Sequence, residues 1–171
     1  MRIQPIETPR LFLRGFTKED ARFAVSIWND PEMGEYLPDE AMEEIDEAYL
    51  REIEALGEDE ECCYLIAEDR VSHMRIGTCS FIPSADGAVY DIAYCVHRDF
   101  WNRGYATEMA RGMIDYAKLQ GAKKMTVRVN RENAASNRVV QKLGFAIVGA
   151  DSYKKRGTEQ IFTDHLYELI L

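Results

Sequence analysis

The feature that most constrains the fold is a strand, a glycine turn and a helix that follow one another within residues 91–119. An apolar strand ends near His97, and a short turn containing Gly104 leads directly into the helix. Apolar residues recur along this helix at i, i+3, i+4 and i+7, namely Ala106, Met109, Ala110, Met113, Ile114 and Ala117. A glycine turn before a helix leaves backbone N–H groups unpaired at the positive end of the helix dipole. The junction therefore predicts a phosphate-binding site, although an ordinary connection has the same local pattern.

Hydrophobic periodicity predicts about seven strands and four helices along the chain. The predicted strands are residues 8–16, 62–67, 74–82, 88–96, 125–129, 145–148 and 161–171, and the predicted helices are 21–28, 38–56, 106–119 and 133–143. Turn residues 83–87 predict an antiparallel hairpin. The helix between strands 88–96 and 125–129 predicts a parallel pair. The fold class is α+β, with a mostly antiparallel sheet.

The length of the chain and the spacing of its cysteines restrict the kinds of protein that it can be. A chain of 171 residues fits one domain, residues 1–171. No apolar run reaches the roughly 18 residues of a membrane-spanning helix, and no signal segment begins the chain, so we expect a cytoplasmic protein without a membrane partner. The four cysteines lack C-x-x-C spacing, so we expect reduced, mostly buried thiols and no metal site.

Charge is distributed unevenly within a chain whose net charge is -9. Residues 30–61 hold 15 acidic residues and one basic residue, whereas residues 98–142 hold 10 basic and 4 acidic residues. The basic region coincides with the glycine turn and suits a polyanionic ligand. The acidic region would attract a cationic amine, or it would only form a solvated surface. The acidic net charge argues against a nucleic-acid partner.

Three segments resemble the GNAT acetyltransferases. Residues 101–108, Trp-Asn-Arg-Gly-Tyr-Ala-Thr-Glu, resemble the segment that holds the pyrophosphate of acetyl-CoA, and residues 133–145 resemble the segment beside the coenzyme A arm. Residues 8–16 resemble the first strand of the Rim-type branch, the ribosomal-protein N-acetyltransferases. The resemblance spans nearly the whole chain. It implies the GNAT fold, in which the parallel pair is splayed, and acetyl-CoA as cosubstrate without a metal.

The resemblance assigns cofactor binding mainly to the backbone. Main-chain groups of Tyr94, Cys95 and Val96 would contact the pantetheine arm in the gap between the splayed strands, and one N–H would polarise the thioester oxygen. The amides that would hold the pyrophosphate belong to Asn102, Arg103, Gly104, Tyr105, Ala106 and Thr107. Arg98 and Arg103 are candidate charge partners, and Asn133 would bind the arm as well as cap its helix. Trp101 stands where the broader family has Gln or Arg, and it matches the Rim-type branch.

Two side chains are the candidate catalytic groups. Asp91 lies on the predicted central strand, where the Rim-type branch carries an acidic residue proposed as the base. Many GNAT enzymes use a tyrosine seven residues after the asparagine as general acid, but this chain has Val140 there. Ser136, three residues after Asn133, occupies the place of the serine proposed for that role in the Rim-type branch. A structural carboxylate and a helix-start hydroxyl are the alternatives for Asp91 and Ser136.

The predicted function is transfer of an acetyl group from acetyl-CoA to a primary amine by direct attack in a ternary complex. The acceptor is a protein N-terminal amine or a small-molecule amine. An α-amine with a pKa of about 7.8 needs only a weak base, because about one molecule in seven is already neutral at pH 7. The loop at residues 30–36 is a candidate substrate contact, or a plain connection between two helices. A non-catalytic acyl-CoA-binding sensor is the alternative, and the chain would be a monomer or a homodimer.

Overall fold

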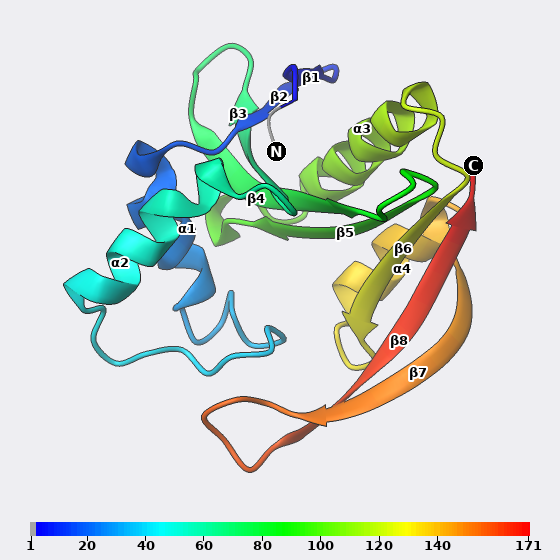
Figure 1. The fold of residues 1–171 in the computed structure, drawn as a ribbon. Helices are drawn as coiled ribbons and strands as arrows, with labels where there is room; N and C mark the ends of the chain where they lie inside the picture. The colour runs from blue at the N-terminus through cyan, green and yellow to red at the C-terminus, as the bar shows by residue number, and fades with distance from the viewer. Residues whose placement is uncertain (1–2) are drawn as a thin grey trace.

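The computed structural model describes residues 3–171, which form one eight-stranded sheet flanked by helices (Figure 1). The strands are β1 (Ile6–Glu7), β2 (Leu11–Gly15), β3 (Cys63–Asp69), β4 (Arg75–Pro83), β5 (Val89–Val96), β6 (Lys124–Asn130), β7 (Ala146–Lys154) and β8 (Ile161–Ile170). The helices are α1 (Ala21–Trp28), α2 (Glu47–Glu54), α3 (Tyr105–Leu119) and α4 (Ala134–Lys142). The strand order is β1-β2-β3-β4-β5-β6-β8-β7, and only β5 and β6 pair in parallel. The predicted mixed sheet with one parallel pair is confirmed.

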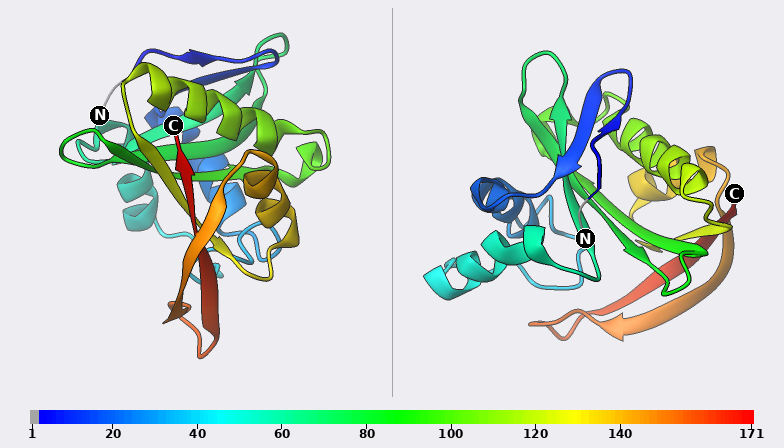
Figure 2. Two further views of the ribbon diagram at one scale, coloured as in Figure 1. Left: turned by 90° about the vertical axis from the view of Figure 1, so that its right-hand side faces the viewer. Right: turned by 45° about the horizontal axis from the view of Figure 1, so that its top comes forward.

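The two faces of the sheet are covered by different helices, because side chains alternate along each strand. Helices α3 and α4 pack on one face, where Leu13, Leu65, Met113 and Met125 belong to a single buried cluster. Figure 2 shows α3 lying across this face. Helices α1 and α2 pack on the other face, over a smaller cluster that includes Ile66. The face under α1 and α2 is only partly covered, which leaves room for a cavity.

Helix α1 is fixed to the sheet by one fully buried carboxylate. Asp20 makes ion pairs with Arg14 at 2.8 Å and Arg75 at 2.7 Å, from β2 and β4. Its Oδ2 also accepts hydrogen bonds from the Thr17 backbone and hydroxyl, which form a capping box. Burial alone would raise the pKa of Asp20, but these donors hold it well below its usual range. The network therefore sets the position of α1 and of Trp28 at its end.

Helix α2 begins later than the sequence predicts. Residues 38–45 are not helical, and α2 starts after Asp46, whose carboxylate accepts a hydrogen bond from the Tyr49 N–H at 2.7 Å. The apolar residues Met42 and Ile45, predicted to lie on the helix, are 39% and 38% exposed. A capping carboxylate outweighs apolar spacing here, because it satisfies the first free amides of the helix. Strand β7 extends to Lys154, six residues beyond its predicted end.

The structure agrees to within a few residues with the predicted strands β2, β4 and β5 and with the predicted helices α1, α3 and α4. It also contains a two-residue strand, β1, that was not predicted. All four cysteines are free, and three of them are buried. Within residues 3–171, no helix is long and apolar enough to span a bilayer.

Candidate functional site

The glycine turn before α3 presents a row of free amides. The N–H groups of residues 102–107 donate to no acceptor within residues 3–171, and the first backbone bond of the helix runs from Glu108 N–H to the Gly104 carbonyl. Asn102 and Gly104 both have left-handed backbones, with φ of +59° and +78°. Left-handed residues alternating with others turn successive N–H groups toward one point, which makes an anion-binding concavity. The turn thus has the geometry that a pyrophosphate needs.

A basic residue that the sequence analysis missed lies against this turn. The Arg10 guanidinium donates to the Arg103 carbonyl at 3.0 Å, pairs with Glu108 at 2.6 Å and stacks over the Tyr105 ring at 4.2 Å. Arg98, considered a charge partner for phosphate, is instead held by Asp30 and Glu32. Arg10 is more than 90 residues from the turn in sequence, so no local pattern could have predicted the contact.

Strands β5 and β6 diverge as the GNAT resemblance implies. They pair only at Val89–Lys124, Tyr90–Met125 and Asp91–Thr126. Asp91 therefore lies at the apex of a V whose arms are the later residues of the two strands. On the opposite side, β5 stays paired with β4, where Gly77 allows a very close approach: a Cβ there would lie 2.1 Å from the Cys95 carbonyl oxygen. Because of this gap, residues 92–96 of β5 are not paired with β6.

Strand β5 presents different chemistry on its two faces. Tyr90, Ile92, Tyr94 and Val96 alternate toward α3 and α4 and belong to, or pack against, the main core. Asp91, Ala93 and Cys95 project to the other face, where α1 and α2 pack. The free amides and α4 therefore lie on one side of β5, and the cavity described below lies on the other side.

The phenol of Tyr94 forms a hydrogen bond to the Ser136 hydroxyl at 2.9 Å. This contact spans the open part of the V, because Ser136 is in the first turn of α4, which follows β6. Burial raises the pKa of Tyr94 to about 12, although the Ser136 hydrogen bond opposes the shift. The sequence analysis assigned Tyr94 a backbone role only. The alternation of side chains along β5 could have predicted that the Tyr94 side chain lies on the α4 side. It could not have predicted that Ser136 is its hydrogen-bond partner.

Asp91 accepts a hydrogen bond from the Thr126 hydroxyl at 2.5 Å across the parallel pair. Burial raises the pKa of Asp91 above its ordinary value, and the bond from Thr126 and the charge of Arg128 reduce the shift. The carboxylate has no ion pair among the described residues. It is therefore half-buried and more basic than an exposed aspartate.

Other predicted contacts are occupied within the protein. The Trp101 indole N–H donates to the Val96 carbonyl at 2.7 Å, which takes up one of the backbone groups assigned to the pantetheine arm. Asn133 caps α4 by accepting the Ser136 N–H at 3.1 Å. The Asn133 side-chain N–H groups make no bond to the described part of the chain, so they remain available to a ligand. Val140 is fully buried in the core.

A cavity of about 850 Å³ lies on the α1 and α2 side of the sheet. Its floor carries Tyr64, Thr78, Ser80, Ala93 and Cys95 from β3, β4 and β5, and Trp28 and Tyr49 are among its walls. Burial raises the pKa of the Cys95 thiol to about 11. A neutral thiol is a poor nucleophile, so the cavity offers no ready acceptor for a covalent acyl intermediate.

The family of the chain follows from comparison with known proteins. Residues 10–146 match the family described as "Acetyltransferase (GNAT) domain". The chain is 24% identical over 177 residues to the uncharacterized N-acetyltransferase p20 of Bacillus licheniformis, covering 98% of this chain and 97% of that one.

Two solved structures share the fold. An acetyltransferase of the GNAT family from Bacillus anthracis superimposes with a TM-score of 0.82 at 19% identity, covering 98% of each chain. Spermidine N-acetyltransferase from Vibrio cholerae, in complex with CoA and spermine, has a TM-score of 0.80 at 18% identity, covering 94% of this chain and 95% of that one. The strand order, the splayed pair and the amide-lined turn agree with the family match: the chain belongs to the GNAT family and is an N-acetyltransferase that uses acetyl-CoA.

Proposed function

We propose that this protein transfers the acetyl group of acetyl-CoA directly to a primary amine bound in the 850 Å³ cavity, within one domain that spans residues 1–171. The observation that carries the proposal is the continuity of three features. The free amides of residues 102–107 begin α3, the V between β5 and β6 opens beside them, and the cavity lies across β5. A polyanionic thioester donor and an amine acceptor would then approach β5 from opposite faces.

In this proposal the cofactor is bound mainly by the main chain. The amides of Asn102 to Thr107 bind the pyrophosphate, with Arg103 supplying positive charge and Arg10 bracing the turn through the Arg103 carbonyl. The β5 backbone from Tyr94 to Val96 and the Asn133 side chain contact the pantetheine arm, and Trp101 shapes the turn by its bond to Val96.

The chemical step needs a base on one face and a proton donor on the other. The amine nitrogen attacks the thioester carbon, and the proton it loses passes, through a water molecule, to Asp91. The carbon–sulfur bond then breaks, and the thiolate accepts a proton from the paired hydroxyls of Ser136 and Tyr94. Solvent then takes the proton from Asp91 and returns one to the hydroxyl pair, so the amide and the thiol leave neutral and both catalytic groups regain their starting protonation. The buried position of Asp91 favours this role, because burial makes the carboxylate more basic.

A glycine substitution with a matched control tests the binding half of the proposal. Gly104 and Gly87 both have positive φ, and a Cβ at either would meet no atom closer than 3.6 Å. Gly104→Ala and Gly87→Ala should therefore each lose about 1–2 kcal/mol of stability through backbone strain. Only Gly104→Ala should weaken acetyl-CoA binding in isothermal titration, by at least about tenfold, because relief of the strain would turn an amide of the turn away from the pyrophosphate and a lost charge-assisted hydrogen bond costs about 1.5 kcal/mol or more. Absence of binding to the wild-type protein at high micromolar acetyl-CoA would falsify the proposal.

A second pair of variants tests the base. Asp164 on β8 projects to the same face as Asp91, by the registers Asp91–Thr126 and Asn130–Asp164. It is buried, its Oδ1 has no hydrogen-bond partner in the described structure, and burial raises its pKa too. Asp91→Asn should lower kcat by about 100-fold or more. Asp164→Asn should leave kcat within about threefold of wild type, and the reverse result would assign the base to Asp164.

A further inference from the structure

We infer that the acceptor is a small primary amine carried on an apolar or aromatic body, rather than a polyamine or a peptide. This inference rests on the proposed function, because it specifies the substrate class of the same cavity. The cavity volume of about 850 Å³ is near the upper end of the range for drug-sized ligands. A short hydrophilic amine would leave most of it filled with water.

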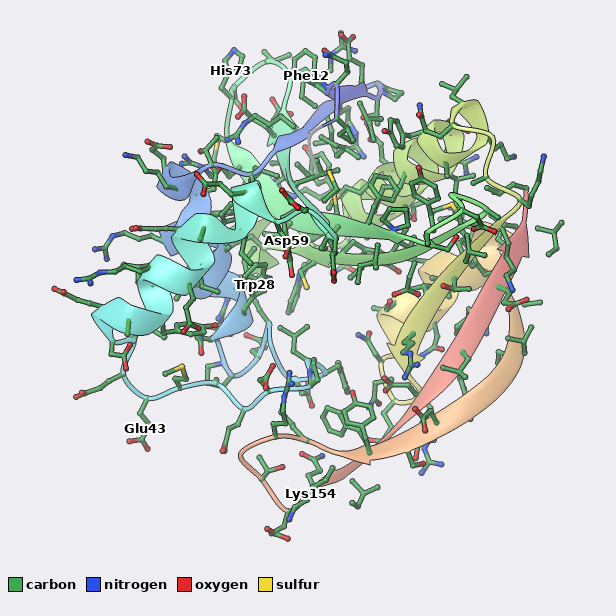
Figure 3. The ribbon with its side chains drawn as sticks, viewed as in Figure 1. Phe12, Trp28, Glu43, Asp59, His73 and Lys154 are labelled. Carbon is green, nitrogen blue, oxygen red and sulfur yellow. The ribbon has the colours of Figure 1, made fainter. Side chains whose placement is uncertain are left out.

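Aromatic side chains fixed in orientation form the wall nearest α1. The Trp28 indole N–H donates to the Thr78 hydroxyl at 3.2 Å, which joins the end of α1 to the cavity floor. The Asn29 amide donates to the Tyr49 hydroxyl at 3.3 Å, which fixes a second ring on α2. Figure 3 shows Trp28 between the helices and the sheet. The polar atoms of these rings already have partners, so the rings offer their apolar faces to a ligand.

The segment at residues 37–43 closes the cavity on the side away from the sheet. It is held by the loop between β7 and β8: Arg156 N–H donates to the Pro38 carbonyl at 2.8 Å, and Glu40 N–H donates to the Arg156 carbonyl at 2.9 Å. The Arg156 guanidinium also makes a bidentate pair with Asp39. Two segments more than 100 residues apart therefore enclose the ligand space together.

Charge inside this space is limited, although residues 30–61 are strongly acidic. Of the three carboxylates lining the cavity, Asp39 is neutralised by Arg156. Glu43 points away from the sheet in Figure 3. Glu40, an exposed residue of the lining, is the one left, without an ion pair in the described chain. One carboxylate suits one ammonium group, whereas a polyamine needs several spaced along its length.

The floor also argues against a peptide acceptor. Peptides are commonly recognised by adding a strand to a free sheet edge. Strands β3, β4 and β5 pair with one another beneath the cavity, and the unpaired edge of residues 92–96 faces β6, where the proposed function places the pantetheine arm, so the floor presents side chains to the acceptor.

A homologous series of n-alkylamines, from propylamine to octylamine, tests the inference at nearly constant amine pKa. Turnover is followed as thiol release from acetyl-CoA, and binding is followed by titration of each amine into the free protein. We expect kcat/KM and the association constant to rise about two- to fourfold per methylene, since each buried methylene contributes up to about a factor of four. Tryptamine should exceed spermidine and a short peptide in kcat/KM by at least tenfold.

The binding measurement separates the inference from the proposed function. If acetyl-CoA does not bind but alkylamines bind with the expected increments, the proposed function fails and the cavity assignment stands. A flat or falling series in both measurements, or a preference for spermidine or for the peptide, overturns the inference.

Filling the cavity gives an independent check with a matched control. Ser80→Leu places an apolar side chain on the floor, on β4 rather than on the strand at which the reaction occurs. It should lower the octylamine-to-propylamine ratio of kcat/KM by about tenfold. Ala150→Leu, at an exposed position of β7 outside the cavity lining, should leave the ratio unchanged. An unchanged ratio in Ser80→Leu would place the alkyl chain elsewhere and contradict the assignment.

Discussion

Replacement of Tyr94 by phenylalanine tests whether the hydroxyl pair across the V assists departure of the thiolate. The substitution removes one oxygen and keeps the ring that packs against the core. It ends the 2.9 Å hydrogen bond to Ser136, which then keeps only its own hydroxyl for the sulfur. Because burial raises the pKa of Tyr94 to about 12, the phenol keeps its proton at every working pH.

The size of the effect follows from the charge that develops on sulfur. A hydrogen bond to a charged group contributes about 1.5–3 kcal/mol. The Tyr94 hydroxyl either orients the Ser136 proton toward the sulfur or donates its own proton. In both cases the hydrogen bond stabilises charge that exists only in the transition state, so Tyr94→Phe raises the activation free energy by this amount. At about 1.4 kcal/mol per factor of ten, kcat should fall by roughly 10- to 150-fold. The KM for acetyl-CoA should change by less than about twofold, because the ground-state thioester carries no charge on sulfur.

Steady-state thiol release at saturating amine, with titration of acetyl-CoA affinity, measures both quantities. Tyr90→Phe is the matched control, since Tyr90 projects to the same face of β5 and also belongs to the main core. It should leave kcat within about twofold of wild type. Ser136→Ala should lower kcat similarly, and the double variant should lose much less than the product of the two single losses, because both hydroxyls serve one proton transfer.

Two results would refute the reasoning. One is a kcat for Tyr94→Phe within twofold of wild type, which would leave the phenol a structural role. The other is an equal loss in kcat and in acetyl-CoA affinity with full additivity in the double variant, which would mean that Tyr94 positions the cofactor rather than assisting the leaving group.

Three further predictions concern the base, the fold and the cavity. Thr126→Val removes the donor that favours the charged form of Asp91, so the acid limb of the kcat/KM profile should move to higher pH; an unmoved limb would exclude Asp91 as the base. Asp20→Asn should lower the free energy of unfolding by about 3 kcal/mol in urea titrations at pH 7. Because the folded pKa of Asp20 is depressed, this difference should be complete above about pH 4 and should shrink as the pH falls further; a constant difference would contradict the assignment. Arg156→Ala should raise the KM for the amine about two- to fivefold without changing acetyl-CoA affinity, since an exposed ion pair contributes about 0.2–1 kcal/mol. An equal change in acetyl-CoA affinity would show that the loop acts on the whole site.

The extent of α2 shows how a local signal can mislead. The apolar residues at 42–56 follow helical spacing, yet the chain enters the helix only at Asp46, where a side chain caps the free amides. The preceding residues instead bond to Asn29 and Arg156, which are distant in sequence. Those contacts produce the non-helical segment that closes the cavity.

The amino-acid sequence alone determined the features that depend on neighbouring residues. The glycine turn, the helix after it, the cap at Asn133 and the parallel crossover all follow from spacing and backbone preference within short segments. These features were enough to predict the fold class and to propose a place for the cofactor, since the proposed site is built from consecutive amides.

Only the tertiary structure decided what surrounds those amides and what lies across β5. The approach of Arg10 to the turn, the bond from Tyr94 to Ser136 and the engagement of Arg98 by Asp30 join segments 42 to 93 residues apart. Such contacts depend on the register and splay of strands that pair over long distances, and no short-range pattern encodes them. The proposed acceptor cavity is of the same kind, because its walls come from α1, α2, three strands and the β7–β8 loop.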